Sequence, residues 1–152
     1  MHPHYGHLIR ILHWCTDQTI TAALEEQELT SAQGHIMGYL SRQTKPPCPR
    51  NIEEVFHLSH PTVSGLLSRL EQKGFIRLYP DPDDRRCKRI HLQPKGLQCH
   101  DTMHRIIQEN ENRMVRDFTP EEKEQFASLL QRAIANMGGG PCQFHSQEES
   151  QT

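Results

Sequence analysis

The chain has 152 residues and a mass of 17.6 kDa, which suits one domain and leaves no room for a second of full size. Its formal net charge of −2 means that any surface for a polyanion must be local. There is no run of about 18 apolar residues, a secretory leader is not expected from the first ten residues, and the five scattered cysteines include no CxxC pair. These features exclude a membrane span, a disulfide scaffold and a zinc finger, and they predict a cytoplasmic protein.

Apolar residues recur mostly at three- and four-residue steps, so the chain is predicted to be mainly helical. Three segments open with the residue spacing of a capping box, at Thr30, Asn51 and Thr119. The proline-rich segment 45–49 is expected to form a loop, because proline interrupts helices. In chain order, the predicted helices cover 5–25, Thr30 to Leu40, Asn51 to Phe56, 60–73, 95–116 and Thr119 to Met137.

The middle of the chain has the residue pattern of a winged helix-turn-helix. Pro61 suits the first turn of the helix over 60–73, and Gly74 supplies its C-terminal stop. The period then changes to that of strands over 75–79 and 89–92, which enclose a polar turn rich in Pro and Asp. The predicted fold class is therefore mainly α with a small β-hairpin wing, a winged helix-turn-helix with further helices at both ends.

This fold binds DNA by placing its second helix in the major groove, while the first helix braces it across the backbone. The apolar stripe of that helix must face the core and consists of Val63, Leu66, Leu67 and Leu70. The residues left pointing outward are Thr62, Ser64, Gly65, Ser68, Arg69 and Gln72. Hydroxyl groups there suit contact with base edges, and Arg69 is long enough to reach a phosphate. The alternative is that these are ordinary exposed polar residues.

The predicted hairpin concentrates positive charge where a loop protrudes. Residues 77–91 contain five basic and three acidic side chains, a local charge of +2 in a chain that is acidic overall. A narrow minor groove attracts an inserted arginine, and Asp84 could hold the Arg86 guanidinium in position by a bidentate pair. The candidate DNA contacts on this wing are Asp84, Arg85, Arg86 and Lys88. The alternative is a solvated charged turn.

Several motifs in one order resemble the MarR family of bacterial transcription regulators. They are LTSAQGHIMGYL in the second helix, IEEVFHLSHPTVSGLLSRLEQKG over 52–74, the wing DPDDRRCKRIHL and the following QPKG. The resemblance covers about residues 5–137 and implies a homodimer on a pseudo-palindromic operator. It implies recognition contacts over Pro61 to Arg69, a minor-groove arginine at Arg86 and its orienting aspartate at Asp84. Most members of the family repress transcription and release DNA when a small ligand binds or a cysteine is oxidised.

The resemblance also implies how the chain is divided. A single regulator domain is expected over 1–137, with a DNA-binding core at about 30–96 and dimerisation helices at about 5–25 and 95–137. The helices over 5–25 and 120–137 carry wider apolar stripes than a short winged helix needs, which agrees with burial between two subunits. The tail 138–152 is expected to be disordered.

Eleven histidines raise the alternative of metal sensing. His100 and His104 are spaced i, i+4, which places both imidazoles on one helical face, a spacing that can chelate a transition metal. The resemblance adds His35, because the family's ligand pocket lies near the second and fifth helices. The bland alternative is that the two histidines pack in a core or interface with their hydrogen bonds satisfied.

A small aromatic or phenolic ligand is a further candidate signal, implied by the same family pocket. The candidate effector residues include these three histidines and are Trp14, His35, Ile36, Tyr39, His100 and His104. The sequence does not identify the ligand.

Two cysteines are candidates for redox control, which requires an accessible thiol of low pKa. Cys87 stands between Arg86 and Lys88, and those cations favour a thiolate. Cys15 resembles, in its general location, the reactive cysteine of peroxide-sensing relatives, although nothing in the sequence would lower its pKa. Most cysteines in such chains are inert thiols or small core residues.

No nucleophile elbow, phosphate-binding glycine loop or HExxH motif occurs, so an enzyme is not expected. The predicted function is a sequence-specific regulator of double-stranded DNA, a homodimeric repressor that needs no cofactor and is released by an unknown small-molecule effector or another signal. Two alternatives remain: a metal- or redox-responsive regulator of the same fold, or a winged-helix interaction module that does not bind DNA.

Overall fold

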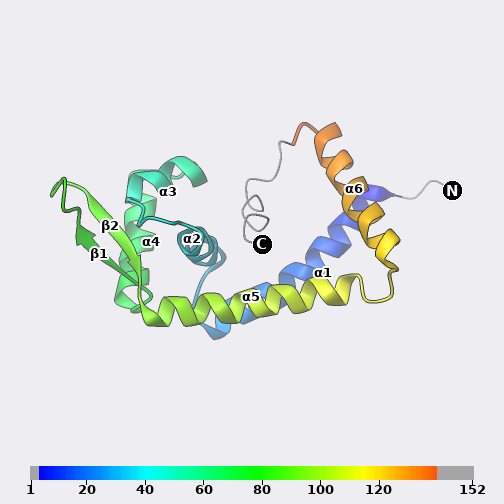
Figure 1. Ribbon diagram of the computed structural model, residues 1–152, viewed down its shortest axis with the longest axis horizontal. Helices are drawn as coiled ribbons and strands as arrows, with labels where there is room; N and C mark the ends of the chain where they lie inside the picture. Colours follow the sequence, from blue (N-terminus) through cyan, green and yellow to red (C-terminus); the bar gives the residue numbers. More distant parts are fainter. Residues whose placement is uncertain (1–3, 140–152) are drawn as a thin grey trace. The chain divides into compact units, whose positions relative to one another are not determined.

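The computed structural model describes residues 4–139 of the chain (Figure 1). Six helices and one antiparallel two-stranded hairpin in this part confirm the predicted fold class. The tail predicted to be disordered lies, beyond Gly139, outside the described residues. In chain order, the elements are α1 (Tyr5–Glu26), α2 (Ser31–Ser41), α3 (Pro49–Phe56), α4 (His60–Gln72), β1 (Ile76–Pro80), β2 (Lys88–Leu92), α5 (Pro94–Met114) and α6 (Pro120–Asn136).

The chain divides into two compact units, Met1–Asn110 and Glu111–Thr152. The first unit contains the core, in which α2, α3 and α4 pack on one another and on the hairpin. Phe75 and the other large side chains at its centre are at most 2% exposed, and each buried aliphatic or aromatic side chain contributes about 1.5–3 kcal/mol. The largest members are Ile36, Ile52, Leu70, Phe75, Ile76 and Ile90.

The predicted capping box at Thr30 is present at the start of α2. Thr30 Oγ1 accepts a hydrogen bond from the Gln33 amide at 3.3 Å, and Gln33 Oε1 accepts one from the Thr30 amide at 3.0 Å. These reciprocal bonds satisfy donors that a helix start leaves unpaired. The capping box predicted at Thr119 is also present, at the start of α6.

The predicted start of the short helix was wrong. Helix α3 begins at Pro49, with Cys48 as the N-cap, so Pro49 does not belong to the loop. Asn51 is the third residue of the helix, and its Oδ1 accepts a hydrogen bond from the Cys48 amide at 2.9 Å. The physical reason is that proline fits the first helical turn, where its missing N–H would be unpaired in any residue.

The hairpin pairs Ile76 with Leu92 and Pro80 with Lys88 at its two ends. Strand β1 starts one residue later than predicted because the Phe75 amide donates to Leu70 O at 3.0 Å and closes the end of α4. Gly74 adopts φ +81°, which favours glycine and confirms it as the helix stop. The Ile90 amide donates to Pro47 O at 2.9 Å, so the segment before α3 runs along β2.

Outside this core, the helices bury few of their apolar side chains within one chain. Within the first unit, the buried residues of helix α1 are Ala23 and Leu24, and Asn110 Nδ2 of α5 donates to Thr16 O of α1 at 3.2 Å. In the second unit, Phe118 and Phe126 meet edge to face with their centroids 5.6 Å apart. Helix α6 has no buried residue. None of the helices in residues 4–139 is both long and apolar enough to span a bilayer.

Candidate nucleic-acid interface

Helix α4 presents a buried side and a polar side, as the sequence predicted. Ser59 caps its start: its hydroxyl accepts a hydrogen bond from the Thr62 amide at 3.4 Å and lies 2.8 Å from the Thr62 hydroxyl. Val63, Leu67 and Leu70 are buried. Pro61 is exposed, and so are all the residues predicted to face outward, namely Thr62, Ser64, Gly65, Ser68, Arg69 and Gln72. The Thr62 hydroxyl interacts with the Ser59 hydroxyl of the cap, whereas the Ser64 and Ser68 hydroxyls take no part in the cap.

An ion pair fixes the base of the wing. Asp81 Oδ2 accepts a hydrogen bond from Arg89 Nε at 2.6 Å, and Arg89 Nη1 donates to Pro46 O at 3.3 Å. The Asp83 amide, which donates to Asp81 Oδ1 at 2.8 Å, and the Arg89 guanidinium hold the pKa of Asp81 below its usual value. Arg89 therefore serves the structure of the wing, although the sequence counts it among the wing's positive charges.

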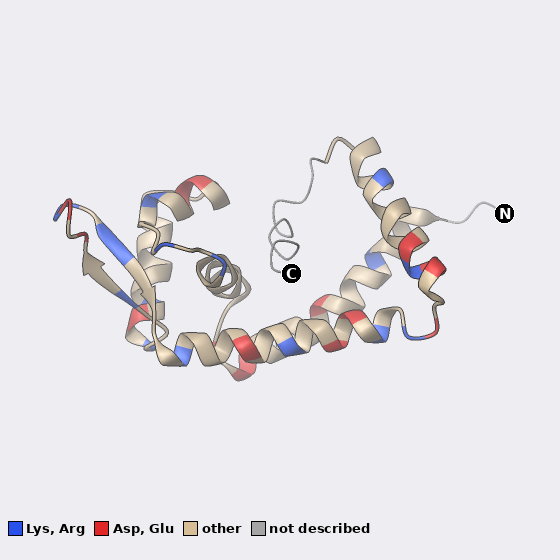
Figure 2. Ribbon diagram, viewed as in Figure 1, with Lys and Arg blue, Asp and Glu red and all other residues tan. Residues whose placement is uncertain are grey.

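The expected bidentate pair between Asp84 and Arg86 is not the contact that the structure shows. Asp84 Oδ1 accepts a hydrogen bond from the Arg86 backbone amide at 3.0 Å, the two-residue spacing of an Asx turn. In this turn the Asp84 carboxylate contacts the backbone of Arg86 and not its guanidinium, so the contact differs from the predicted pair. Arg85, Arg86 and Lys88 are all exposed. Figure 2 shows basic and acidic residues together at the tip of the hairpin.

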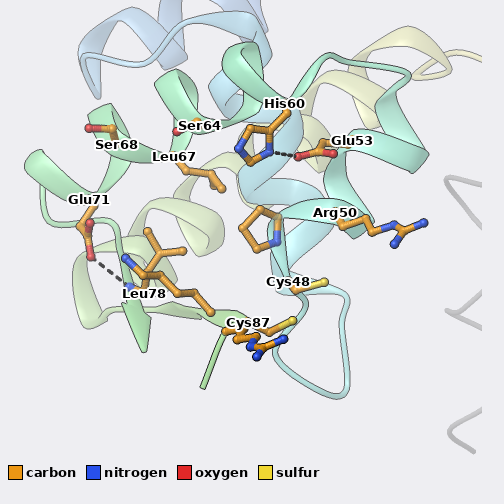
Figure 3. Close-up of a pocket in the computed structure, with 13 residues that line it drawn as sticks. Cys48, Arg50, Glu53, His60, Ser64, Leu67, Ser68, Glu71, Leu78 and Cys87 are labelled. Atoms are coloured by element: carbon orange, nitrogen blue, oxygen red, sulfur yellow. Dashed lines mark hydrogen bonds and ion pairs between the residues drawn. The ribbon is translucent and has the colours of Figure 1, made fainter. Parts of the chain in front are cut away.

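A hollow of about 640 Å³ lies between the polar side of α4, the start of α3 and the wing (Figure 3). Ser64 and Ser68 of α4 line it together with Arg86 and Lys88 of the wing. The structure thus brings together two sets of predicted DNA contacts that are about twenty residues apart in the sequence. The other residues that line the hollow are Cys48, Pro49, Arg50, Glu53, His60, Leu67, Glu71, Leu78 and Cys87.

His60 is a site residue that the sequence analysis did not single out. Its Nδ1 lies 2.6 Å from Glu53 Oε1, so a hydrogen bond crosses the turn between α3 and α4 (Figure 3). The carboxylate can only accept, which makes Nδ1 the donor and leaves Nε2 on the outer edge of the ring. The ring is 77% exposed on the polar side of α4. The sequence did contain a signal for this contact, because Glu53 and His60 are seven residues apart on the two sides of the predicted turn between helices.

The candidate effector residues do not form one cluster. Ile36 is 1% exposed and lies in the core, so it is sealed from a ligand, whereas Trp14 is exposed on α1. Tyr39 meets Phe56 edge to face, with the ring centroids 5.8 Å apart. Burial and the Cys48 and Glu54 charges raise the pKa of Tyr39 above its usual value. His35 is exposed on α2.

The spacing of His100 and His104 does place their rings on one side of α5, with centroids 6.1 Å apart. Burial is the main cause that lowers the pKa of His100, and it favours the neutral ring. Within residues 4–139, no three His, Cys, Asp or Glu side chains come together as a set that could hold a metal ion. His35 therefore does not complete a site with this pair within one chain.

The expected electrostatics of Cys87 are corrected by the structure. The Asp84 carboxylate, with Sγ 3.8 Å from Oδ2, is the main cause that raises the pKa of Cys87 above its usual value. The acidic residues of the turn face the thiol more effectively than its sequence neighbours Arg86 and Lys88. Cys15 is exposed on α1, and Cys99 is buried, which raises the pKa of its thiol.

Comparison with known proteins agrees with this geometry. The model of the MarR family matches residues 29–88. The chain is 28% identical to the HTH-type transcriptional regulator PecS of Dickeya dadantii over 121 residues, which are 76% of this chain and 71% of PecS. It is 31% identical to MepR in the crystal structure of the Staphylococcus aureus MepR–DNA complex, covering 88% of this chain and 99% of that one with a TM-score of 0.75. The structure of a putative MarR family transcriptional regulator from Clostridium acetobutylicum is 28% identical, covers 88% and 98%, and has a TM-score of 0.71.

The family predicted from the helix and wing motifs is confirmed by these three kinds of similarity. The similar proteins are regulators, which agrees with the expectation that the chain is not an enzyme. The chain belongs to the MarR family of transcription regulators.

Proposed function

We propose that the chain is a homodimeric repressor that binds a pseudo-palindromic site on double-stranded DNA in the cytoplasm. The observation that carries this proposal is the shared hollow, in which hydroxyl groups of α4 and cations of the wing face one space. The similarity to MepR, whose crystal structure was solved as a DNA complex, supports the same assignment.

In this proposal, α4 enters the major groove and the wing lies along the neighbouring minor groove. Ser64 and Ser68 approach base edges, because their side chains are short and can donate or accept hydrogen bonds. Pro61, Thr62 and Gly65 allow close approach at the start of the helix. Arg69, in the last turn of α4, binds a phosphate.

The wing contacts come from Arg85, Arg86 and Lys88, with Arg86 entering the minor groove. The turn that Asp84 forms with the Arg86 amide shapes the backbone from which this side chain projects. Asp84 is thus a positioning residue that acts through the backbone. Arg89 is left out of the contact set, because it binds Asp81.

Exposed apolar side chains support the homodimer. On α1, Leu8, Ile9 and Trp14 are each more than half exposed, and on α6 Leu129 is 59% exposed. Soluble monomers rarely leave such patches uncovered, so a second copy of the chain is the proposed cover. A symmetric dimer would present two α4 helices to half-sites about 34–36 Å apart.

DNA binding in this proposal needs no cofactor, and release follows a small ligand or another signal. Tyr39, His100 and His104 remain candidates for contact with an effector, because they are not sealed in the core. A small aromatic molecule is the proposed class of effector.

Fluorescence anisotropy tests the proposal, with a labelled duplex from the region upstream of the chain's own gene and a scrambled duplex of the same composition. We expect the first to bind about 10³-fold more tightly than the second at matched salt. Equal affinity for both duplexes would contradict sequence-specific binding, and absence of binding at low salt would leave a protein-interaction module as the function.

The Arg69→Ala variant sharpens the same assay. It should weaken binding to both duplexes alike and reduce the slope of log affinity against log salt by about one, as expected for one lost phosphate contact. A change in base preference with an unchanged salt slope would contradict the phosphate assignment.

A further inference from the structure

The side of α4 that faces the hollow begins with a histidine. His60, Ser64 and Ser68 all line the hollow and follow one another at four-residue steps, so they form one stripe along the helix. Figure 3 shows the three side chains in this order along α4. The proposed function assigns Ser64 and Ser68 to DNA, and the stripe extends past them to His60.

The turn between α3 and α4 holds this histidine beside an acid. The Leu58 amide donates to Glu53 O at 3.1 Å and closes the end of α3, where His57 adopts the left-handed conformation with φ +52°. Ser59 then caps α4, which makes His60 the first residue of the helix. His60 Nδ1 thus lies 2.6 Å from Glu53 Oε1, and the acid is only 22% exposed. One nitrogen of the ring is held by this bond, while the ring as a whole stays exposed.

The bond to Glu53 fixes what the outer nitrogen of the ring can do. A carboxylate only accepts hydrogen bonds, so Nδ1 carries a proton in both the neutral and the charged ring. Nε2 is therefore an acceptor when the ring is neutral and a donor when the ring is charged. Protonation of His60 alone decides whether this end of α4 offers a ligand an acceptor or a positively charged donor.

The charges around the hollow suit an anionic ligand. Besides His60, the charged and titratable groups that line it are Cys48, Arg50, Glu53, Glu71, Arg86, Cys87 and Lys88. Both acids already accept hydrogen bonds, because Glu53 faces His60 and Glu71 Oε1 accepts one from a backbone amide of β1 at 3.0 Å. The wing adds the exposed cations Arg86 and Lys88, which a DNA backbone attracts.

Histidine is also the side-chain type whose charge changes near neutral pH. Carboxylates, guanidinium groups and lysine ammonium groups keep their charge between about pH 6 and about pH 8. The raised pKa of Cys87 keeps that thiol neutral in the same range. A change of DNA affinity across this range therefore reports on His60, provided that the other histidines of the chain are controlled for.

We propose that His60 binds a phosphate of the DNA backbone through its protonated ring, and that Glu53 is the positioning residue that orients the ring. Nε2–H donates to a phosphate oxygen and Nδ1–H donates to Glu53, so the charged ring lies between two anions, which favour it. Each ring that is neutral in the free protein takes up one proton when DNA binds. The assignment rests on the proposed function, in which α4 enters the major groove.

The first experiment tests the arrangement of the ring without DNA. Long-range ¹H–¹⁵N correlation spectra of the ¹⁵N-labelled full-length protein show which ring nitrogen of a neutral histidine carries the proton, and comparison with His60→Asn identifies the His60 signals. The neutral ring should be protonated at Nδ1, and Glu53→Ala should remove this preference. Both residues lie at the surface, where such a pair adds little stability, so the variants should fold. A wild-type ring protonated at Nε2 would overturn the assignment whatever the protein binds.

The second experiment measures anisotropy on the upstream and scrambled duplexes at about pH 6 and about pH 8 and at matched salt. The wild type should bind both duplexes about tenfold more tightly at the lower pH, because a phosphate contact carries no sequence information. His60→Ala should lose this difference and show a smaller salt slope at the lower pH. His60→Lys, which keeps a charge at both pH values, should bind tightly at both.

Matched variants separate this contact from other causes. His57→Asn removes the neighbouring histidine, and asparagine tolerates its left-handed backbone, so the pH dependence of the wild type should remain. Cys48→Ser should also keep it. Glu53→Ala should weaken binding at the lower pH in the wild type but should not weaken binding in the His60→Ala background, since Glu53 acts through the ring.

The outcomes distinguish this contact from the proposed function. If His60→Ala keeps the pH dependence, the phosphate contact is overturned and specific DNA binding still stands. Tighter binding by the wild type at the higher pH would also overturn it, because a neutral ring can only accept, as from the amino group of a base. A wild type that binds neither duplex at either pH would overturn the proposed function, and this contact with it.

Discussion

The winged helix-turn-helix core and the two outer helices use apolar residues in opposite ways. In the core, Phe75, Ile52 and Leu70 are at most 1% exposed, and the helices and the hairpin cover one another. On α1 and α6, Trp14 is 61% exposed and Leu129 is 59% exposed. The core is thus complete within a single chain, whereas the outer helices leave large apolar side chains exposed, which the proposed dimer would cover. One chain therefore contains a complete winged helix-turn-helix core and two outer helices that each carry large apolar side chains not buried within that chain.

The largest expected effect is on stability and comes from a substitution in the winged helix-turn-helix core. Phe75→Ala removes a side chain that is 1% exposed and should lower the free energy of unfolding by about 3–5 kcal/mol. Urea unfolding followed by circular dichroism measures this loss. Gln72→Ala, at the exposed end of α4, is the matched control and should change stability by less than about 0.5 kcal/mol. Similar values for the two variants would contradict the assignment of the core.

The next largest effect is expected on the outer helices, where a substitution in α6 tests the proposed dimer. Leu129→Glu places a charge in the exposed apolar stripe of α6 and should dissociate the dimer with little loss of helix content, because α6 buries no residue within its own chain. Size-exclusion chromatography with light scattering measures the mass. Ser128→Glu, on the other side of α6, should leave the dimer intact. A Leu129→Glu variant that remains a dimer would show that α6 does not form the subunit interface.

A smaller effect is expected where the core meets DNA. Arg86→Ala should weaken binding to the operator by about 1–3 kcal/mol, the value of one good groove contact. Arg132→Ala, an exposed arginine of α6, should leave affinity unchanged. Anisotropy titrations measure the operator affinity of the wild type and of both variants, after each protein has been shown to be a dimer. Unchanged affinity of the Arg86→Ala dimer would exclude a minor-groove role.

The smallest effect concerns the attachment of the wing to the core. The pKa of Asp81 is lowered in the folded protein, so its ionised form stabilises the fold above the usual pKa of about 3.9 and this stabilisation is lost as the pH falls through the lower folded value. Asp81→Asn should be less stable than the wild type at neutral pH, with the difference shrinking below about pH 4. Thermal unfolding of both proteins between neutral and acid pH measures it. A constant difference across that range would show that the Arg89 ion pair is not the source.

The sequence predicted the long elements well because their patterns are periodic. Helix α4 was placed within one residue, since a serine cap, an early proline, a clear apolar stripe and a final glycine all agree. The start of α3 was missed because proline is ambiguous: it ends a helix but also suits the first turn of one. The rules for local structure agree at α4 and conflict at α3.

The candidate site was predictable as a set of surfaces but not as a set of contacts. The pairing of Arg89 with Asp81 depends on how the turn folds, and the bond between His60 and Glu53 depends on how two helices cross. For Cys87, the neighbours along the chain are cations, but the neighbours in space are the acids of the turn. The sign of the pKa shift therefore follows the fold of the turn and not the order of the residues.

A hydroxyl-radical footprint of the protein on the upstream duplex tests the central claim most directly, because it reports the position of each subunit on the DNA. The account predicts two protected half-sites with centres about 34–36 Å apart, each with protection in the neighbouring minor groove. That flanking protection should be lost with Arg86→Ala, while the protection of the half-sites remains. A single protected site, or minor-groove protection that Arg86→Ala does not alter, would contradict a dimer that reads DNA through α4 and the wing.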